Sequence, residues 1–277
     1  MNSNKTTLII PDLHHRWRQA EHIISKVGHD EVIFLGDYFD DFYDTQQMVQ
    51  ETCDWLEMSI NKPNRLHLFG NHEMGYAFPY SSFQCSGYTP WKYFLIHDYL
   101  KQTVWDKMKW FTFLDDQWLL SHGGLHNLNL PQSIAEKHTN RTEFIAAIDK
   151  YLNDELAQGF RDGANSVRSW IFSAGNARGG NQRVGGITWC DFEREFYPIK
   201  GINQIVGHTP QGMGFPKWCV INHDNSVGFY PAHEFSPTIE NLNNPNLSHN
   251  IDLDVWKNTH YAVWNGNVLQ IGNYNDL

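Results

Sequence analysis

Short apolar runs alternate with stretches of helical periodicity at the start of this chain, and this order leaves few choices of fold. Residues 6–10, 31–35 and 66–69 are apolar and short, as buried strands are. Residues 16–27 and 44–60, which lie between them, are predicted to be helices. A β-α-β-α-β order predicts a sheet with parallel strands and right-handed crossovers.

A polar motif directly follows each of these apolar runs, and two more motifs of the same kind follow apolar runs later in the chain. The five motifs are Asp12-Leu13-His14, Gly36-Asp37 with Asp40, Gly70-Asn71-His72-Glu73, Ser121-His122-Gly123-Gly124 and Gly207-His208-Thr209. In parallel sheets, ligands gather outside the carboxyl ends of the strands. We therefore expect the polar side chains of these motifs to converge on one place.

The converging side chains have the chemistry of metal ligands. Two carboxylates, one amide and three imidazoles make up the set, which is Asp12, His14, Asp37, Asn71, His122 and His208. Residues i and i+2 of an extended segment point to the same side, so Asp12 and His14 can bind one ion together. The mixed set predicts two divalent cations, Mn first and Fe or Zn as alternatives, rather than Mg or Ca. Two cations would bind a phosphate and lower the pKa of a water held between them.

Each motif taken alone also has an ordinary structural explanation. Gly-Asp after a strand is common in turns, and Gly70-Asn71-His72-Glu73 suits the start of a helix. His122 and His208 could each be a hydrogen-bonded histidine of the core. All five motifs occur in order, each after an apolar run, and this joint occurrence favours the metal site.

The remainder of the chain offers weaker signals. Residues 76–110 are aromatic and irregular, and we interpret them as an insertion over the site, a loop with one or two helices. A capping box of Asn140 and Glu143 predicts the start of an amphipathic helix. No repeat or linker divides the chain, so we expect one domain over residues 1–277. Shorter predicted elements are a hairpin at 110–121, a Gly-rich loop at 175–186, strands at 204–206, 218–221 and 227–230, a polar loop at 231–248, and a hairpin around Asn265-Gly266.

Charge and cysteine content limit the class of protein. A formal net charge of −10 argues against broad binding to nucleic acid or to anionic membranes, because both need a positive surface. No run approaches the length that spans a bilayer, and none forms a secretory signal. The four cysteines are widely spread and form no Cys-x-x-Cys pair. We therefore expect a cytoplasmic enzyme with free thiols.

The five motifs together resemble the signature of the calcineurin-like metallophosphoesterases, and most closely that of the phosphoprotein phosphatase branch, which is Ser/Thr phosphatase-like. That signature has Asp-x-His-Gly, Gly-Asp-x-x-Asp-Arg-Gly, Gly-Asn-His-Glu, His-Gly-Gly and Gly-His-Thr, and the match covers about residues 6–230. The resemblance implies an α/β fold in which two facing mixed β-sheets are flanked by helices, as a four-layer sandwich. It also implies a metal-dependent phosphoric ester hydrolase.

The same resemblance assigns roles to the motif residues. The first metal ion would be held by Asp12, His14 and Asp37, and the second by Asp37, Asn71, His122 and His208. His72 would be the general acid for the leaving group, with its ring oriented by Asp40. Asn71 would also contact the phosphate of the substrate.

Two positions depart from the family pattern. His15 stands where the family has Gly, so the backbone turn there must accommodate a Cβ. Asp41 stands where the family has a phosphate-binding Arg. Arg178 lies in a segment similar to the family's Asn-Asp-Arg-Gly, and we take it as the candidate phosphate ligand, although a solvated loop Arg is the structural alternative. Arg183 and Arg16 are the other candidates for this role.

The sequence therefore predicts a dinuclear metal-dependent phosphoesterase that hydrolyses phosphate monoesters by attack of a metal-bound hydroxide. Its substrate would be a phosphopeptide or a small phosphate ester, and Pro210, where other branches commonly have a further His, favours the phosphatase branch. One alternative is a nucleotide or dinucleoside polyphosphate hydrolase, if the aromatic insertion holds a base. A second alternative is a degenerate, non-catalytic binding protein, which the departures at His15 and Asp41 suggest and the intact ligand set opposes.

Overall fold

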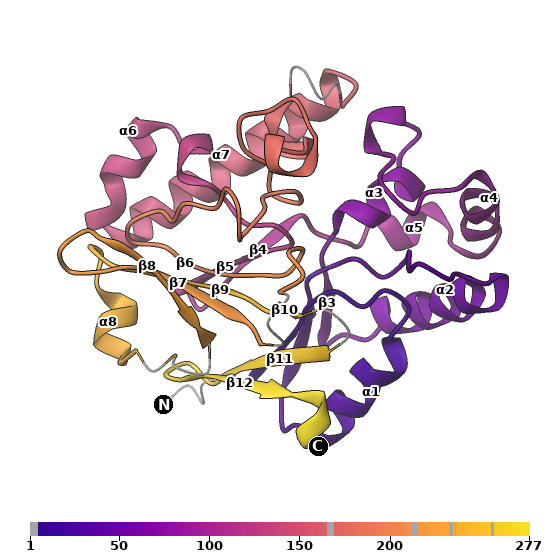
Figure 1. Ribbon diagram of the computed structural model, residues 1–277, viewed down its shortest axis with the longest axis horizontal. Helices are drawn as coiled ribbons and strands as arrows, with labels where there is room; N and C mark the ends of the chain where they lie inside the picture. The colour runs from indigo at the N-terminus through magenta and orange to yellow at the C-terminus, as the bar shows by residue number, and fades with distance from the viewer. Residues whose placement is uncertain (1–4, 165–168, 212–214, 233–234, 236, 256–257) are drawn as a thin grey trace. The chain divides into compact units, whose positions relative to one another are not determined.

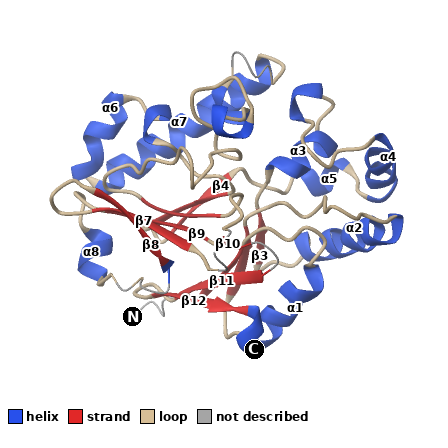
Figure 2. Ribbon diagram, viewed as in Figure 1, coloured by secondary structure: helices blue, strands red, loops and turns tan. Residues whose placement is uncertain are grey.

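The computed structural model describes residues 5–164, 169–211, 215–232, 235, 237–255 and 258–277 (Figure 1). The chain forms two compact units, of which the first is Met1–Trp110 with Lys257–Leu277 and the second is Phe111–Trp256. Each unit has its own mixed β-sheet and its own helices (Figure 2). The predicted α/β class with two mixed sheets flanked by helices is thereby confirmed, whereas the single domain over residues 1–277 stays a prediction.

In the sheet of the first unit, β11, β1, β2 and β3 are neighbours in that order, and β12 pairs with β11. Its strands are β1 (Thr7–Ile10), β2 (Glu31–Phe34), β3 (Arg65–His67), β11 (Asn258–Trp264) and β12 (Leu269–Asn273). The first three strands are parallel, with Thr7 opposite Glu31 and Val32 opposite Arg65, and β11 is antiparallel to both β1 and β12. The predicted parallel β-α-β-α-β arrangement is confirmed, as is the hairpin around Asn265-Gly266.

Two helices connect the parallel strands, α1 (Trp17–Lys26) and α2 (Gln46–Ile60). Helix α2 begins two residues later than predicted, because the Thr45 hydroxyl caps it by accepting from the Met48 N–H at 3.2 Å. Three- and four-residue spacing gives α2 one apolar face. Its buried apolar residues are Val49, Cys53, Trp55, Leu56 and Ile60.

The aromatic insertion contains helices, as predicted. After α3 (Asn71–Ala77), these are a short 3₁₀ turn at Ser81–Phe83, α4 (Pro90–Tyr99) and α5 (Gln102–Trp105). Helix α4, with Pro90 at its first position, packs against α2. The rings of Phe69 and Trp110 stack with centroids 4.5 Å apart, and Trp105 is 2% exposed. Much of the insertion's aromatic surface is therefore core packing.

The sheet of the second unit has the order β4-β5-β6-β9-β7-β8. Its strands are β4 (Phe111–Leu114), β5 (Trp118–Ser121), β6 (Asn203–Val206), β7 (Lys217–Ile221), β8 (Val227–Pro231) and β9 (Ser248–Asp252). Strand β10 (Asp254–Val255) follows β9 in the chain and is not one of the strands of this sheet. Strands β5, β6 and β9 are parallel. The predicted hairpin of β4 and β5 is confirmed, with Asp115 and Asp116 at its turn in left-handed conformation, at φ 52° and 49°.

The long helix of the second unit, α7 (Arg141–Arg161), begins where the capping box predicts, because the Asn140 side chain accepts from the Glu143 N–H at 3.3 Å. Shorter helical elements are the 3₁₀ turns Asn127–Asn129, Glu136–Thr139, Trp170–Phe172 and Asn176–Arg178, with α6 (Gln132–Ala135); in the first unit, Tyr274–Asp276 is another 3₁₀ turn. None of the helices in the part of the chain that the structure describes has the length and apolarity needed to cross a bilayer.

The prediction of a loop over residues 231–248 is wrong in part. Helix α8 (Ile239–Asn243) lies within it, and Thr238 caps this helix by accepting from the Asn241 N–H at 3.2 Å. Strand β9 then starts at Ser248 and lies between β6 and β7. All five residues of β9 are buried although four are polar, so the strand lacks the apolar pattern that predicts one.

Candidate metal centre

The backbone after β1 turns sharply through two histidines. His14 and His15 both have positive φ, at 41° and 65°. Such a conformation costs an ordinary residue about 1–2 kcal/mol, which explains why Gly is usual at the second position. His15 offsets this cost with its buried ring, whose Nδ1 lies 2.8 Å from the Thr52 hydroxyl and whose Nε2 lies 3.2 Å from Asp44. The predicted accommodation of a Cβ at His15 is thus confirmed.

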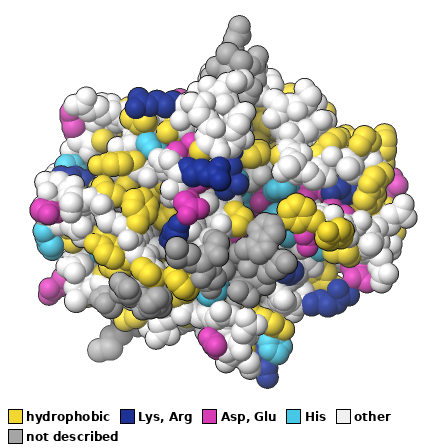
Figure 3. Space-filling view, in the orientation of Figure 1, with side chains coloured by type: hydrophobic (Ala, Val, Ile, Leu, Met, Phe, Trp, Pro, Cys, Tyr) yellow, Lys and Arg dark blue, Asp and Glu magenta, His cyan; other side chains and the backbone are white. Residues whose placement is uncertain are grey.

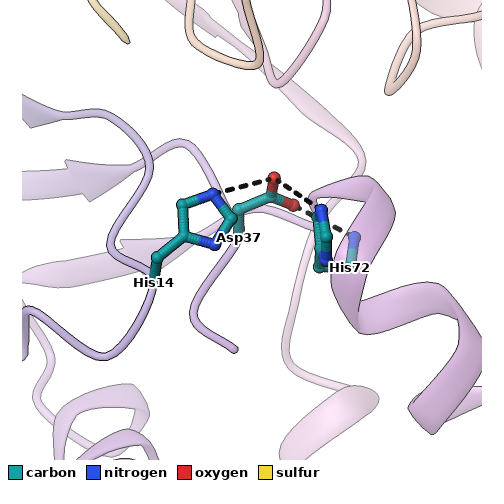
Figure 4. A group of neighbouring side chains, drawn as sticks. All are labelled: His14, Asp37 and His72. Carbon is teal, nitrogen blue, oxygen red and sulfur yellow. Dashed lines mark hydrogen bonds and ion pairs between the residues drawn. The ribbon is translucent and has the colours of Figure 1, made fainter. Parts of the chain in front are cut away.

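His14, Asp37 and His72 meet in the first unit, at the ends of β1 and β2 and the start of α3 (Figure 4). The Asp37 Oδ2 atom lies 3.8 Å from His14 Nε2 and 3.9 Å from His72 Nε2. One ligand atom from each of the three residues lies within 4.8 Å of the others. The group therefore has the donors and the spacing to hold a cation.

The His14 ring is held in the orientation that a metal ligand needs. Its Nδ1 lies 2.9 Å from the Phe39 carbonyl oxygen and also contacts the Asp40 carbonyl. A carbonyl only accepts, so Nδ1 carries the proton and Nε2 offers its lone pair toward Asp37. In metal sites, a hydrogen bond from the ring nitrogen that does not bind the metal usually fixes the tautomer of a ligating histidine.

Glu73 holds the loop that carries Asp37. This carboxylate is fully buried and accepts from the N–H groups of Asp37 at 2.8 Å, Tyr38 at 2.7 Å and Gly70 at 2.9 Å. Burial, with the negative charge of Asp37 adding to it, raises the pKa of Glu73 to about 7. The two loops touch closely, because a Cβ at Gly36 would lie 2.4 Å from the Gly70 nitrogen.

His72 and Asp40 form the predicted dyad, since His72 Nδ1 lies 2.9 Å from Asp40 Oδ2. The other carboxylate oxygen, Oδ1, accepts from the Tyr76 hydroxyl at 2.7 Å and from the Lys92 ammonium. Burial disfavours a charged imidazole, but the interactions with Asp37, Cys85 and Asp40 outweigh it and raise the pKa of His72 well above its usual value. A raised pKa favours the protonated ring, which is the form that a general acid uses.

Asp12 and Asn71 are buried at the positions the prediction needs. Asp12 lies two residues after the end of β1 and is 3% exposed. Asn71 is the first residue of α3 and is 2% exposed. The N–H of the next residue, His72, donates to Asp37 Oδ1 at 3.1 Å, which ties the start of α3 to the aspartate loop. Their roles as ligands stay predictions.

His122 and His208 meet in the second unit, after β5 and β6. His208 Nδ1 lies 3.2 Å from His122 Nε2, and both rings are buried. The two motifs are joined through the backbone, because the Gly207 N–H donates to the His122 carbonyl at 2.8 Å. The Thr209 hydroxyl accepts from the Phe192 N–H at 2.8 Å. Strands β5 and β6 are parallel neighbours, so the residues that follow them meet at one edge of the sheet, and the two histidines converge as predicted.

The sequence of the chain matches the model of a known protein family. A family model described as calcineurin-like phosphoesterase matches residues 5–212. The chain belongs to this family. Membership confirms the predicted recognition and the prediction of a metal-dependent phosphoric ester hydrolase, while the phosphatase branch stays a prediction.

Solved structures with similar folds include other phosphoesterases. A metallophosphoesterase from Sphaerobacter thermophilus is 13% identical, with a TM-score of 0.46, and the match covers 97% of this chain and 87% of that one. A candidate diadenosine tetraphosphatase is 12% identical, with a TM-score of 0.46 and coverage of 98% and 95%. A serine/threonine phosphatase from Saccharomyces cerevisiae with similarity to human phosphatase PP5 is 16% identical, with a TM-score of 0.30 and coverage of 45% and 39%. The comparison with curated proteins gives no match.

Arg178 of this phosphoesterase lies beside the His208 motif. Its Nε atom lies 2.7 Å from Asp191 Oδ2, and a guanidinium N–H donates to the His208 carbonyl at 3.3 Å. The side chain is 26% exposed, so it is neither a freely solvated Arg nor a fully enclosed one. Of the other candidates, Arg16 donates to the Leu13 carbonyl at 3.1 Å in the first unit. The phosphate-binding role of Arg178 stays a prediction.

Asp41 and Asp224 accept hydrogen bonds from residues close to them in the sequence. Asp41 is exposed, and its carboxylate accepts from the neighbouring Phe42 N–H at 2.7 Å. Asp224 is exposed in the turn between β7 and β8, where it accepts from the N–H and the hydroxyl of Ser226. Asp224 is therefore a turn residue.

The donor set of this phosphoesterase fits divalent transition metals. Imidazole with carboxylate suits Mn, Fe and Zn, and the orientation of the His14 ring is what such a ligand requires. On the face drawn in Figure 3, Lys and Arg side chains lie in small separate groups.

Three residues that contact the predicted site residues were not among those predicted from the sequence. Glu73 stands three positions after Gly70, which is the spacing of a capping box and would have indicated its contact with the Gly70 N–H. Tyr76 and Lys92 contact Asp40 from α3 and α4. Tyr76 follows His72 by one helical turn, so it could have been expected on the same face of α3. No sequence signal identifies Lys92, because its place depends on how the insertion folds.

Proposed function

We propose that this phosphoesterase is a dinuclear metal-dependent phosphomonoesterase that acts on a phosphorylated Ser/Thr peptide or a small phosphate ester. The observation that carries the proposal is the His72–Asp40 pair, whose imidazole Nε2 faces Asp37 at 3.9 Å while its Nδ1 is engaged by Asp40. An acid that delivers a proton to a leaving oxygen needs one free ring nitrogen and a partner on the other. His72 has both.

Metal ions would be held by the residues that the family resemblance assigns. In this proposal Asp12, His14 and Asp37 hold one ion, and Asp37, Asn71, His122 and His208 hold a second, with Mn as the first candidate metal. Two such ions would supply Lewis acidity toward phosphate and a water of lowered pKa. Arg178 would bind a phosphate oxygen through its guanidinium, and Asn71 would contact the same group.

The chain's own residues would orient the reaction. Asp40 accepts from the Nδ1–H of His72 and stabilises the imidazolium form, whose other proton, on Nε2, would be the one transferred. Glu73 anchors the backbone of Asp37, which keeps its carboxylate in place as charge changes around it. His14 is kept as a lone-pair donor by the carbonyl of Phe39. These contacts exist before substrate binds, and preorganised groups of this kind contribute most to electrostatic stabilisation.

A test compares substrates and metals on one protein. We expect Mn-supplemented enzyme to hydrolyse p-nitrophenyl phosphate and phosphopeptides, with lower activity on a phosphodiester such as bis(p-nitrophenyl) phosphate. No turnover with Mn, Fe or Zn would contradict the proposal and favour a non-catalytic binding protein. A preference for the diester would contradict the monoesterase assignment. The proposed cytoplasmic location is tested separately by fractionation.

A second candidate function is hydrolysis of a nucleotide or a dinucleoside polyphosphate. Two aromatic side chains directly after the Asp40 motif favour it, because Phe42 is 76% exposed and Tyr43 is 88% exposed. Exposed rings of this kind can stack a base, at about 1–3 kcal/mol per base. The double variant Phe42→Ala and Tyr43→Ala would raise the KM for diadenosine tetraphosphate and leave that for p-nitrophenyl phosphate unchanged. Equal effects on both substrates would remove this candidate.

A further inference from the structure

A thiol lies against the His72–Asp40 pair, at the ring nitrogen that does not face Asp37. Cys85 Sγ is 3.6 Å from His72 Nδ1, and Asp40 Oδ2 is 2.9 Å from the same nitrogen. The three ligand atoms all lie within 4.8 Å of one another. Cys85 is partly exposed, whereas the other three cysteines are buried.

The loop that carries Cys85 is built to approach Asp40 closely. Gly87 has φ 94°, and a Cβ at this position would lie 2.8 Å from the Asp40 Cβ and 2.9 Å from its Cγ. Only glycine permits both the left-handed backbone and this contact. The backbone of the loop that carries Cys85 is therefore held close to Asp40.

Thiolate, imidazole and carboxylate are the three protein donors that zinc prefers. With Zn–S of about 2.3 Å and Zn–N of about 2.0 Å, a tetrahedral site separates S from N by about 3.5 Å. The observed 3.6 Å between Cys85 Sγ and His72 Nδ1 agrees with this separation. Asp40 Oδ1 is already held by Tyr76 and Lys92, so Oδ2 can face a metal while its partner oxygen stays anchored.

We propose that Asp40, His72 and Cys85 form an inhibitory zinc site, distinct from the ions predicted for catalysis. Zinc binding would displace the Cys85 thiol proton and the His72 Nδ1 proton to solvent. His72 would then be a neutral, metal-bound imidazole, and Asp40 would no longer support its charged form. The proton left on Nε2 of a neutral ring is far less acidic than that of the imidazolium, so zinc would weaken the general acid without displacing the catalytic ions. The inhibition rests on the proposed function, whereas the binding of zinc does not.

Cobalt reports this site directly, because thiolate bound to Co²⁺ gives a near-ultraviolet charge-transfer absorption. The experiment adds Co²⁺ to the Mn-loaded full chain and to its Cys85→Ser variant. Ser86→Ala, an exposed substitution in the same loop, is the matched control. The other thiols are poor competitors, since burial raises the pKa of Cys53, Cys190 and Cys219.

The expected result is an absorption band in the wild type and in Ser86→Ala that Cys85→Ser loses. Added Zn²⁺ should abolish the band. Zn²⁺ should also inhibit the Mn-dependent turnover of the wild type and of Ser86→Ala far more strongly than the turnover of Cys85→Ser. Tyr76→Phe should keep the band and weaken cobalt binding by about tenfold or more. A band that persists in Cys85→Ser, or equal zinc inhibition of all three proteins, would overturn the proposal. A band in a protein without any turnover would leave the zinc site intact and contradict the proposed function.

Discussion

The two units hold their strand-end motifs by different means. In the first unit, buried charged side chains add to backbone contacts such as the bond from the His14 N–H to the Asp37 carbonyl at 2.7 Å. Glu73 accepts from four backbone N–H groups, and Asp40 contacts His72, Tyr76 and Lys92. In the second unit, backbone contacts join the motifs, as in the Gly207 N–H to His122 carbonyl bond and the Gly123 N–H to Ile187 carbonyl bond, both 2.8 Å.

This difference determines which substitutions each unit tolerates. A motif fixed by charged side chains is sensitive to changes that keep the shape and remove the charge. A motif fixed by backbone contact is sensitive to any added atom at its glycines. The predictions below test this contrast, from the largest effect to the smallest.

Asp37→Asn should abolish turnover, with a loss of at least about 10³-fold, and should reduce bound metal. The substitution removes the negative charge that faces His14 and His72 and keeps the side-chain volume. Turnover of p-nitrophenyl phosphate and the metal content after dialysis are the measurements. Asp41→Asn is the control, because Asp41 is exposed. An Asp37→Asn protein with wild-type metal content would contradict the ligand assignment.

His72→Asn should slow turnover by about 10²–10⁴-fold for esters with poor leaving groups, the range of general acid catalysis. The loss should be much smaller for p-nitrophenyl phosphate, whose leaving group needs little protonation. Rates for a series of aryl and alkyl phosphates measure this dependence. Metal content should stay near that of the wild type, and a protein that loses metal would overturn the acid assignment.

Glu73→Gln should lower the free energy of unfolding by about 3 kcal/mol. Both oxygens of the Glu73 carboxylate accept from backbone N–H groups. The glutamine side chain has one oxygen only, and its NH₂ group would face N–H donors. Denaturant titration measures the change. Glu57→Gln, at an exposed position of α2, should leave stability unchanged. Equal stabilities for the two variants would show that side-chain anchoring in the first unit is weak.

Gly123→Ala should cost about 2 kcal/mol of stability, because a Cβ there would lie 2.8 Å from the backbone nitrogens of Trp189 and Cys190. Gly28→Ala is the matched control, since a Cβ at Gly28 meets no atom within 4 Å. The midpoints of denaturant unfolding compare the two. If Gly123→Ala unfolds at the wild-type midpoint, the backbone of the second unit is more adaptable than its contacts indicate.

Arg178→Lys should raise the KM of the proposed phosphate substrate about tenfold, with a smaller change in kcat. Lysine keeps the charge and loses the planar fork that binds two oxygens. The Arg183→Lys variant provides the comparison with the alternative candidate. A larger effect from Arg183→Lys than from Arg178→Lys would move the phosphate ligand to Arg183.

Much of the first unit could be predicted from sequence because its signals are local. The apolar runs of β1, β2 and β3 differ in composition from the polar motifs that follow them, and a parallel order fixes the edge where those motifs meet. The departure at His15 also pointed to a turn that must accommodate a Cβ, and the backbone there is left-handed, at φ 65°.

The rest depends on contacts between distant residues. Strand β9 is polar and buried, and its Asn250 donates to Ser248 at 2.8 Å and to the Cys219 carbonyl at 3.3 Å. Periodicity cannot anticipate a strand whose polar groups are satisfied by its neighbours. Cys85 and Lys92 reach the dyad through a loop and a helix of the insertion, and their positions follow from its folding.

Lys92 gives the insertion a role that its position in the sequence does not suggest. Its ammonium is shared by Asp40 and Asp44, and Asp44 also faces His15. Deleting helix α4 would leave two enclosed acids with one fewer cation between them, which is far more damaging than the loss of an accessory loop. Loss of this segment would therefore have to be accompanied by replacement of Asp40 and Asp44, whereas a change in its length elsewhere would not.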